Sequence, residues 1–326
     1  MNDEQFDLTI IGGGTTGLYT AFYAGMRDMK TKVIEYQPGL GGKVSFFYPE
    51  KKIYDVGGFP GVSGEELVSN VEKQALSVEP TIVTREKISS IEKLDDGSFL
   101  LTSGCGGRHY SKTIIIASGL GTFDMEPIQL PGSNLYQSNI HCTIQKIKQY
   151  EGKKAAVLSD SRVGVDWALA LEGVAAEVYL INHGTEFKAV YEHDIDKLEA
   201  STVNVYRETN AVEMKGSDNK LSELVLDSGK RLEVNDLLVY QGLKIEKGKY
   251  EKWGITTEKG RIPVGEDMST NIDGIFAAGD AAIYPHKTML IASGFSEAMT
   301  AVNSAKQAID PKAKSQVYST VIYKHS

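Results

Sequence analysis

The sequence predicts an α/β protein with two Rossmann-like domains of three layers each, the second inserted into the first. Three observations support this prediction. The chain has 326 residues, which is too long for one small core. Residues 7–35 read as a strand, a glycine-rich turn, a helix and a second strand. Residues 155–171 repeat the strand, the turn and the helix, which together begin a nucleotide-binding βαβ unit.

Composition excludes several classes of protein. Hydrophobic residues make up 41% of the chain and glycine occurs 33 times, which suits an α/β protein with many tight turns. The formal charge of -8 argues against nucleic-acid binding, because a nucleic-acid partner needs a basic surface. No apolar run reaches the length of a membrane span, and the start, MNDEQFDLTII, lacks the basic residues of a secretory signal. We therefore expect a cytoplasmic protein with no membrane partner.

The two cysteines, Cys105 and Cys142, lie far apart in the sequence. Neither a disulfide framework nor a CxxC redox pair is available to this chain. Any redox chemistry therefore needs a bound cofactor, and we predict no metal site.

The first glycine-rich turn has the pattern GxGxxG in its expected context. Gly12 is placed to make the turn, Gly14 to let the backbone approach a pyrophosphate, and Gly17 to let the helix pack closely on the strand. The helix N-terminus then meets the phosphate charge. Glu35, at the end of the second strand, can accept hydrogen bonds from a ribose diol. The sequence therefore predicts a dinucleotide site here.

A second small-residue strand, DGIFAAGDAA, ends in Gly279 and Asp280, and a helix starts about ten residues later. An aspartate at a strand end can bind a ribityl hydroxyl, and a helix N-terminus can stabilise negative charge on a reduced flavin. The alternative is an acidic residue that only caps a turn.

Four motifs carry a family resemblance: GGGTTGLY, GLGGKVSFFYPEKKIYDVGGFPG, IIIASG and GIFAAGD. They resemble the FAD domain of the two-dinucleotide flavoprotein reductases. Over essentially the whole chain the sequence is similar to the thioredoxin-reductase-like type of ferredoxin/flavodoxin NADP+ reductase. The YPEKKIYDV stretch is typical of that type, and the absence of CxxC separates the chain from true thioredoxin reductases.

The resemblance implies which residues hold FAD. Gly14, Thr16 and Glu35 would hold the ADP half of the cofactor. Ile88 would meet the adenine through its backbone, and Phe123 would pack near the cofactor.

The flavin half of FAD has its own candidates. Lys43 stands where the family usually has glutamine, and Tyr48 would stack on one ring face; a buried core tyrosine is the alternative for Tyr48. In similar reductases a C-terminal extension folds over the flavin, often that of the partner subunit. Tyr318 stands at that position here, with Thr320 as a hydrogen-bonding neighbour. A frayed chain end is the alternative, and the resemblance implies a homodimer.

We predict that residues 1–120 and 244–326 form the FAD-binding domain and that residues 121–243 form an inserted NADP(H)-binding-like domain. The turn of the inserted domain reads SDSRVG, residues 159–164, where the family has GGGDSA. Each replaced glycine adds a Cβ where backbone must approach phosphate. Asp160 also places a negative charge against the phosphate.

The second half of the NADP(H) site is altered as well. Members that use NADPH carry HRRxxFRA, whose arginines clamp the 2′-phosphate; this chain reads NHGTEFKA at residues 182–189. Arg162 and Lys188 could rescue phosphate binding from new directions, and His183 could help at low pH. The explanation that we favour is that the domain folds but no longer binds NADP(H).

Three functions remain open. The first is an FAD-dependent oxidoreductase of the ferredoxin/flavodoxin NADP+ reductase type, with NADPH as donor. The second is an FAD protein that exchanges electrons with ferredoxin, flavodoxin or a quinone and does not use NADP(H). The third is a flavin-bound module without turnover. In the second case a basic patch could meet an acidic carrier, although a solvated charged face is the alternative; its lysines are Lys146, Lys148, Lys153 and Lys154.

Overall fold

The computed structural model describes residues 4–125, 128–144, 146–240, 243–246, 248 and 250–319. The chain divides into two compact units. Unit 1 comprises Met1–Ser45, Lys51–Thr122 and Ile245–Ser326; unit 2 comprises Phe46–Glu50 and Phe123–Lys244.

The short segment Phe46–Glu50 differs from the predicted domain bounds, which place it in the FAD-binding domain. Aromatic packing explains its place in unit 2. The ring centroids of Phe46 and Phe47 lie 4.7 and 5.0 Å from that of Phe123. The hydroxyl of Thr143 also donates a hydrogen bond to the Phe46 carbonyl.

Unit 1 contains a sheet with the strand order β5-β2-β1-β8-β7-β6, in which β20 also pairs with β8. Strands β5, β2, β1, β8 and β20 run parallel, and β6 and β7 are antiparallel additions. The central strands are apolar on both faces, as strands covered on both sides must be. The bounds are β1 Gln5–Ile11, β2 Thr31–Ile34, β5 Thr81–Val83, β6 Ile88–Lys93, β7 Phe99–Ser103, β8 Arg108–Ile116 and β20 Ile275–Ala277.

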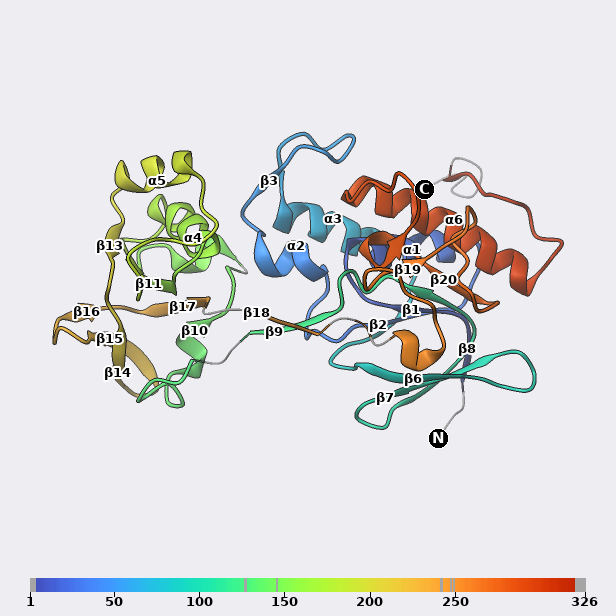
Figure 1. Ribbon diagram of the computed structural model, residues 1–326, viewed down its shortest axis with the longest axis horizontal. Helices are drawn as coiled ribbons and strands as arrows, with labels where there is room; N and C mark the ends of the chain where they lie inside the picture. The colour runs from blue at the N-terminus through green and yellow to red at the C-terminus, as the bar shows by residue number, and fades with distance from the viewer. Residues whose placement is uncertain are drawn as a thin grey trace. The chain divides into compact units, whose positions relative to one another are not determined.

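Three helices lie together along one side of this sheet: α1 (Thr15–Met26), α3 (Gly64–Leu76) and α6 (Ile291–Ile309) (Figure 1). Small buried residues such as Ala24 and Ala298 let α1 and α6 approach closely. The shorter elements of unit 1 are α2 Gly42–Phe47, which continues into unit 2, β3 Lys52–Ile53, β4 Val62–Ser63, η3 Tyr250–Trp253, β19 Ile262–Pro263, η4 Gly279–Ala281 and β21 Ala282–Ile283.

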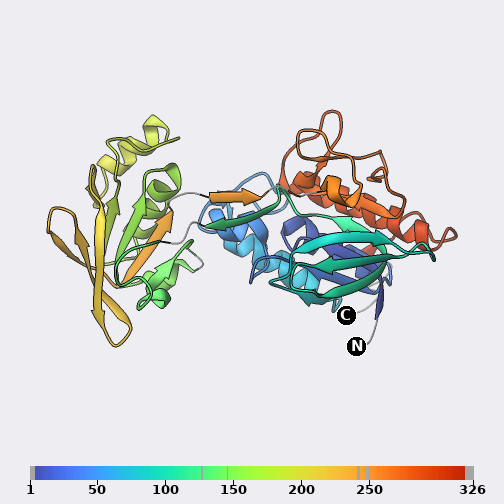
Figure 2. The same cartoon turned by 60° about the horizontal axis from the view of Figure 1, so that its bottom comes forward.

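Unit 2 is built on a parallel sheet with the order β10-β17-β11-β12-β13. The bounds are β10 Ile140–His141, β11 Lys154–Ser159, β12 Glu177–Ile181, β13 Asn204–Tyr206 and β17 Asp236–Tyr240. The helical elements are η1 Gln137–Asn139, η2 Ile147–Tyr150, α4 Arg162–Glu172 and α5 Glu192–Glu199. An antiparallel sheet follows (Figure 2), with β14 Ala211–Ser217, β15 Lys220–Leu226 and β16 Arg231–Glu233. At the two chain passages between the units, β9 (Thr122–Met125) pairs with β18 (Leu243–Glu246).

Alternation along β11 divides the interior of unit 2 into two cores. Val157 packs in a cluster with Trp167 of α4, and the next residue, Leu158, packs in a cluster with Met214 of β14. Successive side chains of a strand point to opposite faces, so one face of the sheet meets the helices and the other meets the antiparallel sheet. Unit 2 therefore has three layers.

Ion pairs occupy two lysines of the candidate basic patch. Lys153 Nζ lies 2.8 Å from Asp236 Oδ2, and His141 Nε2 lies 2.8 Å from Asp236 Oδ1. Burial acts to raise the pKa of Asp236, but hydrogen bonds from His141 and Lys153 outweigh it, so that the pKa is lowered. Lys154 pairs with Glu177 and Glu233. The lysines of the patch that stay exposed without an ion pair in the described chain are Lys146 and Lys148.

Candidate functional site

Two glycines of the first turn are required by the packing of unit 1 itself. Gly12 has φ +110°, and a Cβ there would lie 2.5 Å from the carbonyl oxygen of Ala117. A Cβ on Gly17 would overlap the carbonyl oxygen of Gly12. The turn therefore brings the end of β1 and the start of α1 so close together that no side chain fits between them.

Gly14 is different, because the protein leaves room for a side chain there. It is the N-cap of α1 with φ -72°, and a Cβ would have Gly42 Cα as its nearest atom, at 3.8 Å. In the described part of the chain the NH groups of Gly14 and Thr16 have no protein acceptor. Unpaired NH groups at a helix N-terminus beside open space form a site for an anion such as a phosphate. These residues therefore fit the pyrophosphate of a dinucleotide.

Glu35 follows β2 and holds the same turn. Its Oε2 accepts a hydrogen bond from the NH of Gly13 at 2.6 Å, and its Oε1 accepts one from the NH of Gln37 at 2.7 Å. Burial raises the pKa of Glu35, and the hydrogen bonds from these NH groups act in the opposite direction. The NH of Tyr36 bonds to this carboxylate as well. Of about four acceptor positions on the two oxygens, one therefore remains for a ribose hydroxyl.

Thr16 joins α1 to the C-terminal part of unit 1. A Cβ on Gly279, which has φ +68°, would lie 2.8 Å from Thr16 Oγ1, and a Cβ on Gly294 of α6 would overlap the same oxygen. The first turn of α1, the turn before Asp280 and the start of α6 therefore meet at Thr16.

Lys43 and Asp280 form an ion pair, with Lys43 Nζ 2.6 Å from Asp280 Oδ2. Both side chains are partly exposed. Arg261 Nε also donates to the Asp280 carbonyl at 3.2 Å. The structure thus brings together two residues that the sequence places 237 positions apart, and both belong to the predicted flavin half of the site.

Glu297 of α6 is a residue that the sequence analysis missed. It is 4% exposed and accepts hydrogen bonds from the NH of Gly279 and the hydroxyl of Tyr284, each at 2.7 Å, and from Lys287. Burial and the bond to Glu297 raise the pKa of Tyr284 to about 12. Glu297 holds the turn that carries Asp280. Its spacing from Gly294 and Ala301 puts it on the buried stripe of α6, which was the available signal.

The structure does not join the other predicted residues to this group by a described contact. Ile88 begins β6 and packs in the core with Ile34. Tyr318 is 59% exposed. Tyr48 and Phe123 belong to unit 2, and Thr320 lies outside the described residues. Their contacts with FAD stay predictions. The residues that the structure gathers in unit 1 are Gly12, Gly14, Thr16, Gly17, Glu35, Lys43 and Asp280.

The turn of unit 2 has the same backbone pattern as the turn of unit 1. In unit 1 the NH of Gly41 donates to Gly13 O at 2.8 Å; in unit 2 the NH of Lys188 donates to Asp160 O at 2.6 Å. A parallel β-bridge joins Gly14 to Gly41 in unit 1, and another joins Ser161 to Lys188 in unit 2. The residue after each bridge, Gly42 or Ala189, has a positive φ. The corresponding pairs are Gly13 and Asp160, Gly14 and Ser161, Gly41 and Lys188, and Gly42 and Ala189. The turn of unit 2 therefore has the backbone hydrogen bonding of the first turn, but Asp160 and Ser161 carry side chains where the first turn has glycines.

Two of the first NH groups at α4 have acceptors in the protein, whereas that of Val163, like that of Thr16 in unit 1, has none in the described chain. The NH of Ser161 donates to Ser159 Oγ at 3.2 Å, and the NH of Arg162 donates to Lys188 O at 3.0 Å. This differs from the start of α1, where the corresponding NH of Gly14 has no acceptor in the described chain. The turn of unit 2 thus offers a phosphate fewer donors.

The two cations considered for phosphate rescue also have partners. Lys188 Nζ lies 2.5 Å from Asp160 Oδ2. Arg162 stacks its guanidinium over Tyr191 at 4.4 Å, and its Nε lies 3.6 Å from Asp194 Oδ2. Arg162 therefore turns toward α5, and Lys188 neutralises the carboxylate that replaces a glycine.

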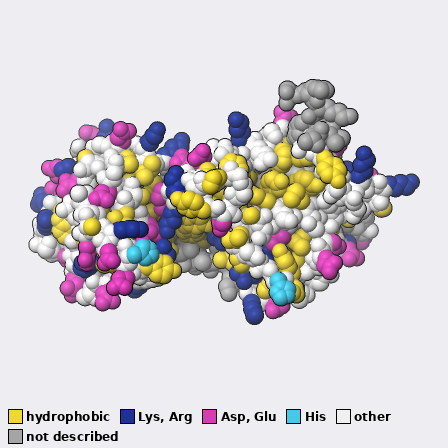
Figure 3. Space-filling model, turned by 90° about the horizontal axis from the view of Figure 1, so that it is seen from above, with side chains coloured by type: hydrophobic (Ala, Val, Ile, Leu, Met, Phe, Trp, Pro, Cys, Tyr) yellow, Lys and Arg dark blue, Asp and Glu magenta, His cyan; other side chains and the backbone are white. Residues whose placement is uncertain are grey.

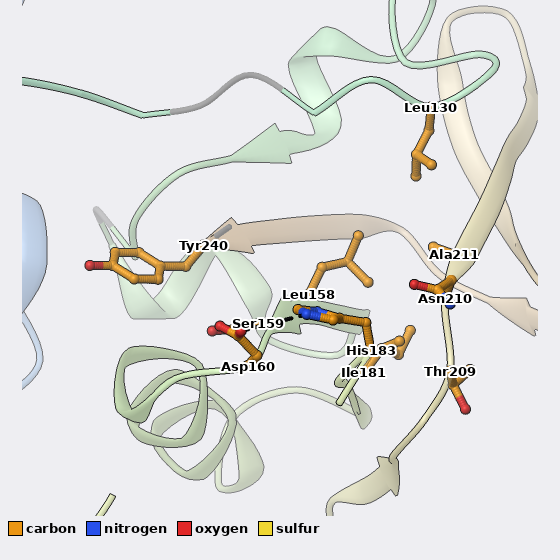
Figure 4. A pocket seen from close by; sticks show the side chains of 10 residues that line it. All are labelled: Leu130, Leu158, Ser159, Asp160, Ile181, His183, Thr209, Asn210, Ala211 and Tyr240. Atoms are coloured by element: carbon orange, nitrogen blue, oxygen red, sulfur yellow. Dashed lines mark ion pairs between the residues drawn. The ribbon is translucent and has the colours of Figure 1, made fainter. Parts of the chain in front are cut away.

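A cavity of about 180 Å³ lies beside this turn, at the carboxyl ends of β11, β12 and β17 (Figure 4). Its polar lining includes Asp160 and His183, whose Nε2 lies 3.7 Å from Asp160 Oδ2. Asn182, before His183, is fully buried and bonds to Gly184 and Glu186, which closes the loop that carries His183.

Comparison with known proteins decides the family. The family model described as pyridine nucleotide-disulphide oxidoreductase matches residues 6–308. The chain belongs to this family. Membership confirms the predicted α/β fold with Rossmann-like parts, and it confirms the prediction of a flavoprotein oxidoreductase with FAD as cofactor.

Two relatives of this pyridine nucleotide-disulphide oxidoreductase match it over nearly its whole length. Ferredoxin–NADP reductase 2 of Bacillus subtilis is 43% identical over 329 residues, covering 99% of this chain and 98% of the relative. Ferredoxin–NADP reductase 1 of Listeria monocytogenes is 40% identical over 318 residues, covering 96% of each chain. These matches confirm the resemblance stated from the motifs.

Solved structures support the fold of this family member. Thioredoxin reductase of Lactococcus lactis has a TM-score of 0.62 at 22% identity, covering 93% of this chain and 99% of that one. Thioredoxin reductase of T. acidophilum has a TM-score of 0.64 at 19% identity, covering 93% and 98%. Among the described residues, no helix combines the length and the apolar character needed to cross a membrane.

Proposed function

We propose that this flavoprotein exchanges electrons with ferredoxin or flavodoxin and that unit 2 does not bind NADP(H). The observation that carries the second part is the turn at Ser159–Gly164. Its first NH groups donate to Ser159 Oγ and Lys188 O, and its former glycine positions carry Asp160 and Ser161. A phosphate would have to displace internal hydrogen bonds and approach a carboxylate.

The chain's own residues define how FAD would be held in unit 1. The NH groups of Gly14 and Thr16 would bind the pyrophosphate, and Glu35 would accept from the ribose. Lys43 and Asp280 would lie on the flavin side. When bound, the flavin supplies the transfer of one or two electrons, and the protein supplies binding and orientation.

The ferredoxin part of the proposal rests on the relatives, which are named ferredoxin–NADP reductases. Flavodoxin is the second candidate carrier because the sequence resembles reductases of both carriers. Lys146 and Lys148, which stay exposed, offer positive charge to an acidic carrier. A quinone acceptor has no specific observation in its favour.

One anaerobic mixing experiment tests the proposal. We expect excess NADPH or NADH to leave the flavin absorbance of the FAD-loaded chain unchanged, because unit 2 lacks a phosphate site. Reduced ferredoxin, mixed under the same conditions, is expected to bleach the flavin within seconds. Bleaching by NADPH would contradict the loss of the nicotinamide site. Failure of both reduced ferredoxin and reduced flavodoxin would instead contradict the choice of partner and favour a module without turnover.

We further propose that the protein is a cytoplasmic homodimer. Large apolar side chains of unit 1 stay exposed in the single chain, among them Tyr54 at 74% and Phe59 at 43%, and Figure 3 shows hydrophobic side chains gathered on one face of this unit. Exposed apolar surface of this kind is typical of a protein interface. Light scattering of the FAD-loaded protein is expected to give twice the chain mass of 35.6 kDa. A monomer with full flavin occupancy would contradict this proposal.

A further inference from the structure

His109 joins three parts of unit 1 by hydrogen bonds and is not among the residues assigned to the FAD site. It lies on β8 and is 7% exposed. Its Nδ1 is 3.4 Å from Lys32 Nζ of β2, and its Nε2 is 3.0 Å from Glu86 Oε2, between β5 and β6. The imidazole ring thus bridges a buried ammonium group and a carboxylate.

This bridge determines where the ring of His109 carries its proton. An ammonium group has only donors, so Nδ1 of His109 accepts from Lys32 and carries no proton. The single proton of the neutral ring is then on Nε2, from which it is donated to Glu86. The bridge therefore consists of one positive charge, one negative charge and a neutral ring between them.

Lys32 is poorly placed to meet a second positive charge. It is 8% exposed, and its Nζ also lies 4.0 Å from the centroid of the Phe6 ring. Burial lowers the pKa of Lys32, and nearby charges act in both directions. These charges are Glu4 and Glu86, which act to raise the pKa, and Lys30, which acts to lower it. A protonated His109 would no longer accept from Lys32 and would place two cations side by side away from solvent.

Glu86 has a second side-chain donor besides His109. Burial acts to raise the pKa of Glu86, but hydrogen bonds from His109 and from Ser103 of β7 outweigh it, so that the pKa is lowered. Ser103 Oγ also lies 3.1 Å from the sulfur of the exposed Cys105, a further titratable group beside the bridge. The carboxylate of Glu86 is therefore held from both β7 and β8.

The backbone of Glu86 is bonded to Glu35. The NH of Glu86 donates to the Glu35 carbonyl at 3.1 Å, and the NH of Arg85 donates to the Gln37 carbonyl at 3.4 Å. Arg85 has φ +62°, which residues with a Cβ rarely adopt. The segment around Glu86 thus lies against the residues that follow β2, and the bridge through His109 holds the side chain of the same residue.

We propose that His109 is a positioning residue for FAD: the neutral ring couples Lys32 to Glu86 and so holds Glu35 in place for the ribose, and protonation of the ring weakens FAD binding. This inference rests on the proposed role of Glu35 as the ribose acceptor. Only the neutral ring makes both hydrogen bonds, so the coupling is present at neutral and higher pH and is lost as the pH falls.

Release of FAD as a function of pH tests the proposal. The FAD-loaded full chain is diluted in steps at each pH, and free FAD is measured by its fluorescence against an FAD standard at that pH. We expect the dissociation constant to rise at least about fivefold between about pH 8 and about pH 5.5, because a hydrogen bond to a charged group is lost. Circular dichroism at each pH checks that the chain stays folded.

Variants of His109 separate its charge from its hydrogen bonds. His109→Gln offers a carbonyl acceptor to Lys32 and an NH donor to Glu86 but takes up no proton. We expect it to bind FAD as tightly as the wild type at high pH and to lose most of the pH dependence. His109→Leu removes both bonds and is expected to weaken FAD binding at every pH. His193→Gln, at a histidine of α5 that is 63% exposed, is the matched control and is expected to keep the wild-type profile.

Two results would overturn the proposal directly. One is a dissociation constant of the wild type that does not change between these pH values. The other is the wild-type pH dependence in His109→Gln, because the titrating group would then lie elsewhere, such as at Glu35, whose pKa is raised by burial. Both results can be obtained even if His109→Leu folds poorly.

Glu35→Gln, measured in parallel at high pH, tells failure of this inference from failure of the proposed function. We expect it to bind FAD more weakly than the wild type, because the ribose loses a charged acceptor. Unchanged affinity in Glu35→Gln would contradict the role of Glu35 in the proposed function and overturn this inference with it. Weaker binding in Glu35→Gln together with an unchanged profile in His109→Gln would overturn this inference alone.

Discussion

Replacement of Gly17 by alanine is expected to disrupt unit 1 and to abolish FAD binding. The added Cβ would overlap the Gly12 carbonyl oxygen, and both atoms belong to the backbone turn, so neither can move without opening the contact between β1 and α1. We expect a loss of at least about 3 kcal/mol in the free energy of unfolding, measured by urea titration with the flavin absorbance recorded in parallel.

Gly14→Ala is the matched control for this prediction. Gly14 has an ordinary φ of -72°, and a Cβ there has 3.8 Å of clearance to Gly42 Cα. We expect this variant to fold as stably as the wild type while it binds FAD more weakly, because the methyl group stands where the phosphate approaches. An equal loss of stability in Gly14→Ala and Gly17→Ala would contradict the assignment of Gly17 to packing and of Gly14 to phosphate binding.

Glu297→Ala is expected to cost about 3–5 kcal/mol of stability, because it leaves the buried ammonium of Lys287 without its counter-charge. It also removes the acceptor of the Gly279 NH, which holds the turn before Asp280. We therefore expect weaker FAD binding as well. The dissociation constant is measured by titrating FAD into the apoprotein and following the flavin fluorescence.

Two further variants separate the charge from the hydrogen bonds of Glu297. Glu297→Gln keeps an acceptor for the Gly279 NH and is expected to lose less FAD affinity than Glu297→Ala. The pair Glu297→Leu with Lys287→Met removes both buried charges and is expected to recover much of the stability but not the FAD affinity. Full FAD affinity in that double variant would show that Glu297 only neutralises Lys287 and does not position the turn.

The sequence was informative where backbone geometry depends on residue type. A strand followed by GxGxxG predicts the turn at Gly12–Gly17, because few residues other than glycine fit beside a crossing carbonyl. For the same reason, the side chains of Ser159, Asp160 and Ser161 predict that a phosphate cannot approach the backbone of the second turn closely.

Side-chain partnerships across long sequence separations could not be predicted. The pairing of Arg162 with Tyr191 and Asp194 depends on how α5 packs beside α4, which no local pattern encodes. The place of Phe46–Glu50 in unit 2 follows from aromatic packing with Phe123, more than 70 residues away. Glu297 carried a signal, a charge on a buried helical stripe, but its three donors come from loops whose course only the structure gives.

The NH groups at the starts of α1 and α4 differ in how many acceptors the protein itself supplies, and this difference bears on folding and cofactor binding. At α4 the protein supplies acceptors for the NH groups of Ser161 and Arg162, so the start of α4 depends less on an external anion than the start of α1. At α1 donors wait for an external anion, so the stability of unit 1 rises with the concentration of free cofactor. We therefore expect unit 1 to become more open to proteolysis when flavin is scarce.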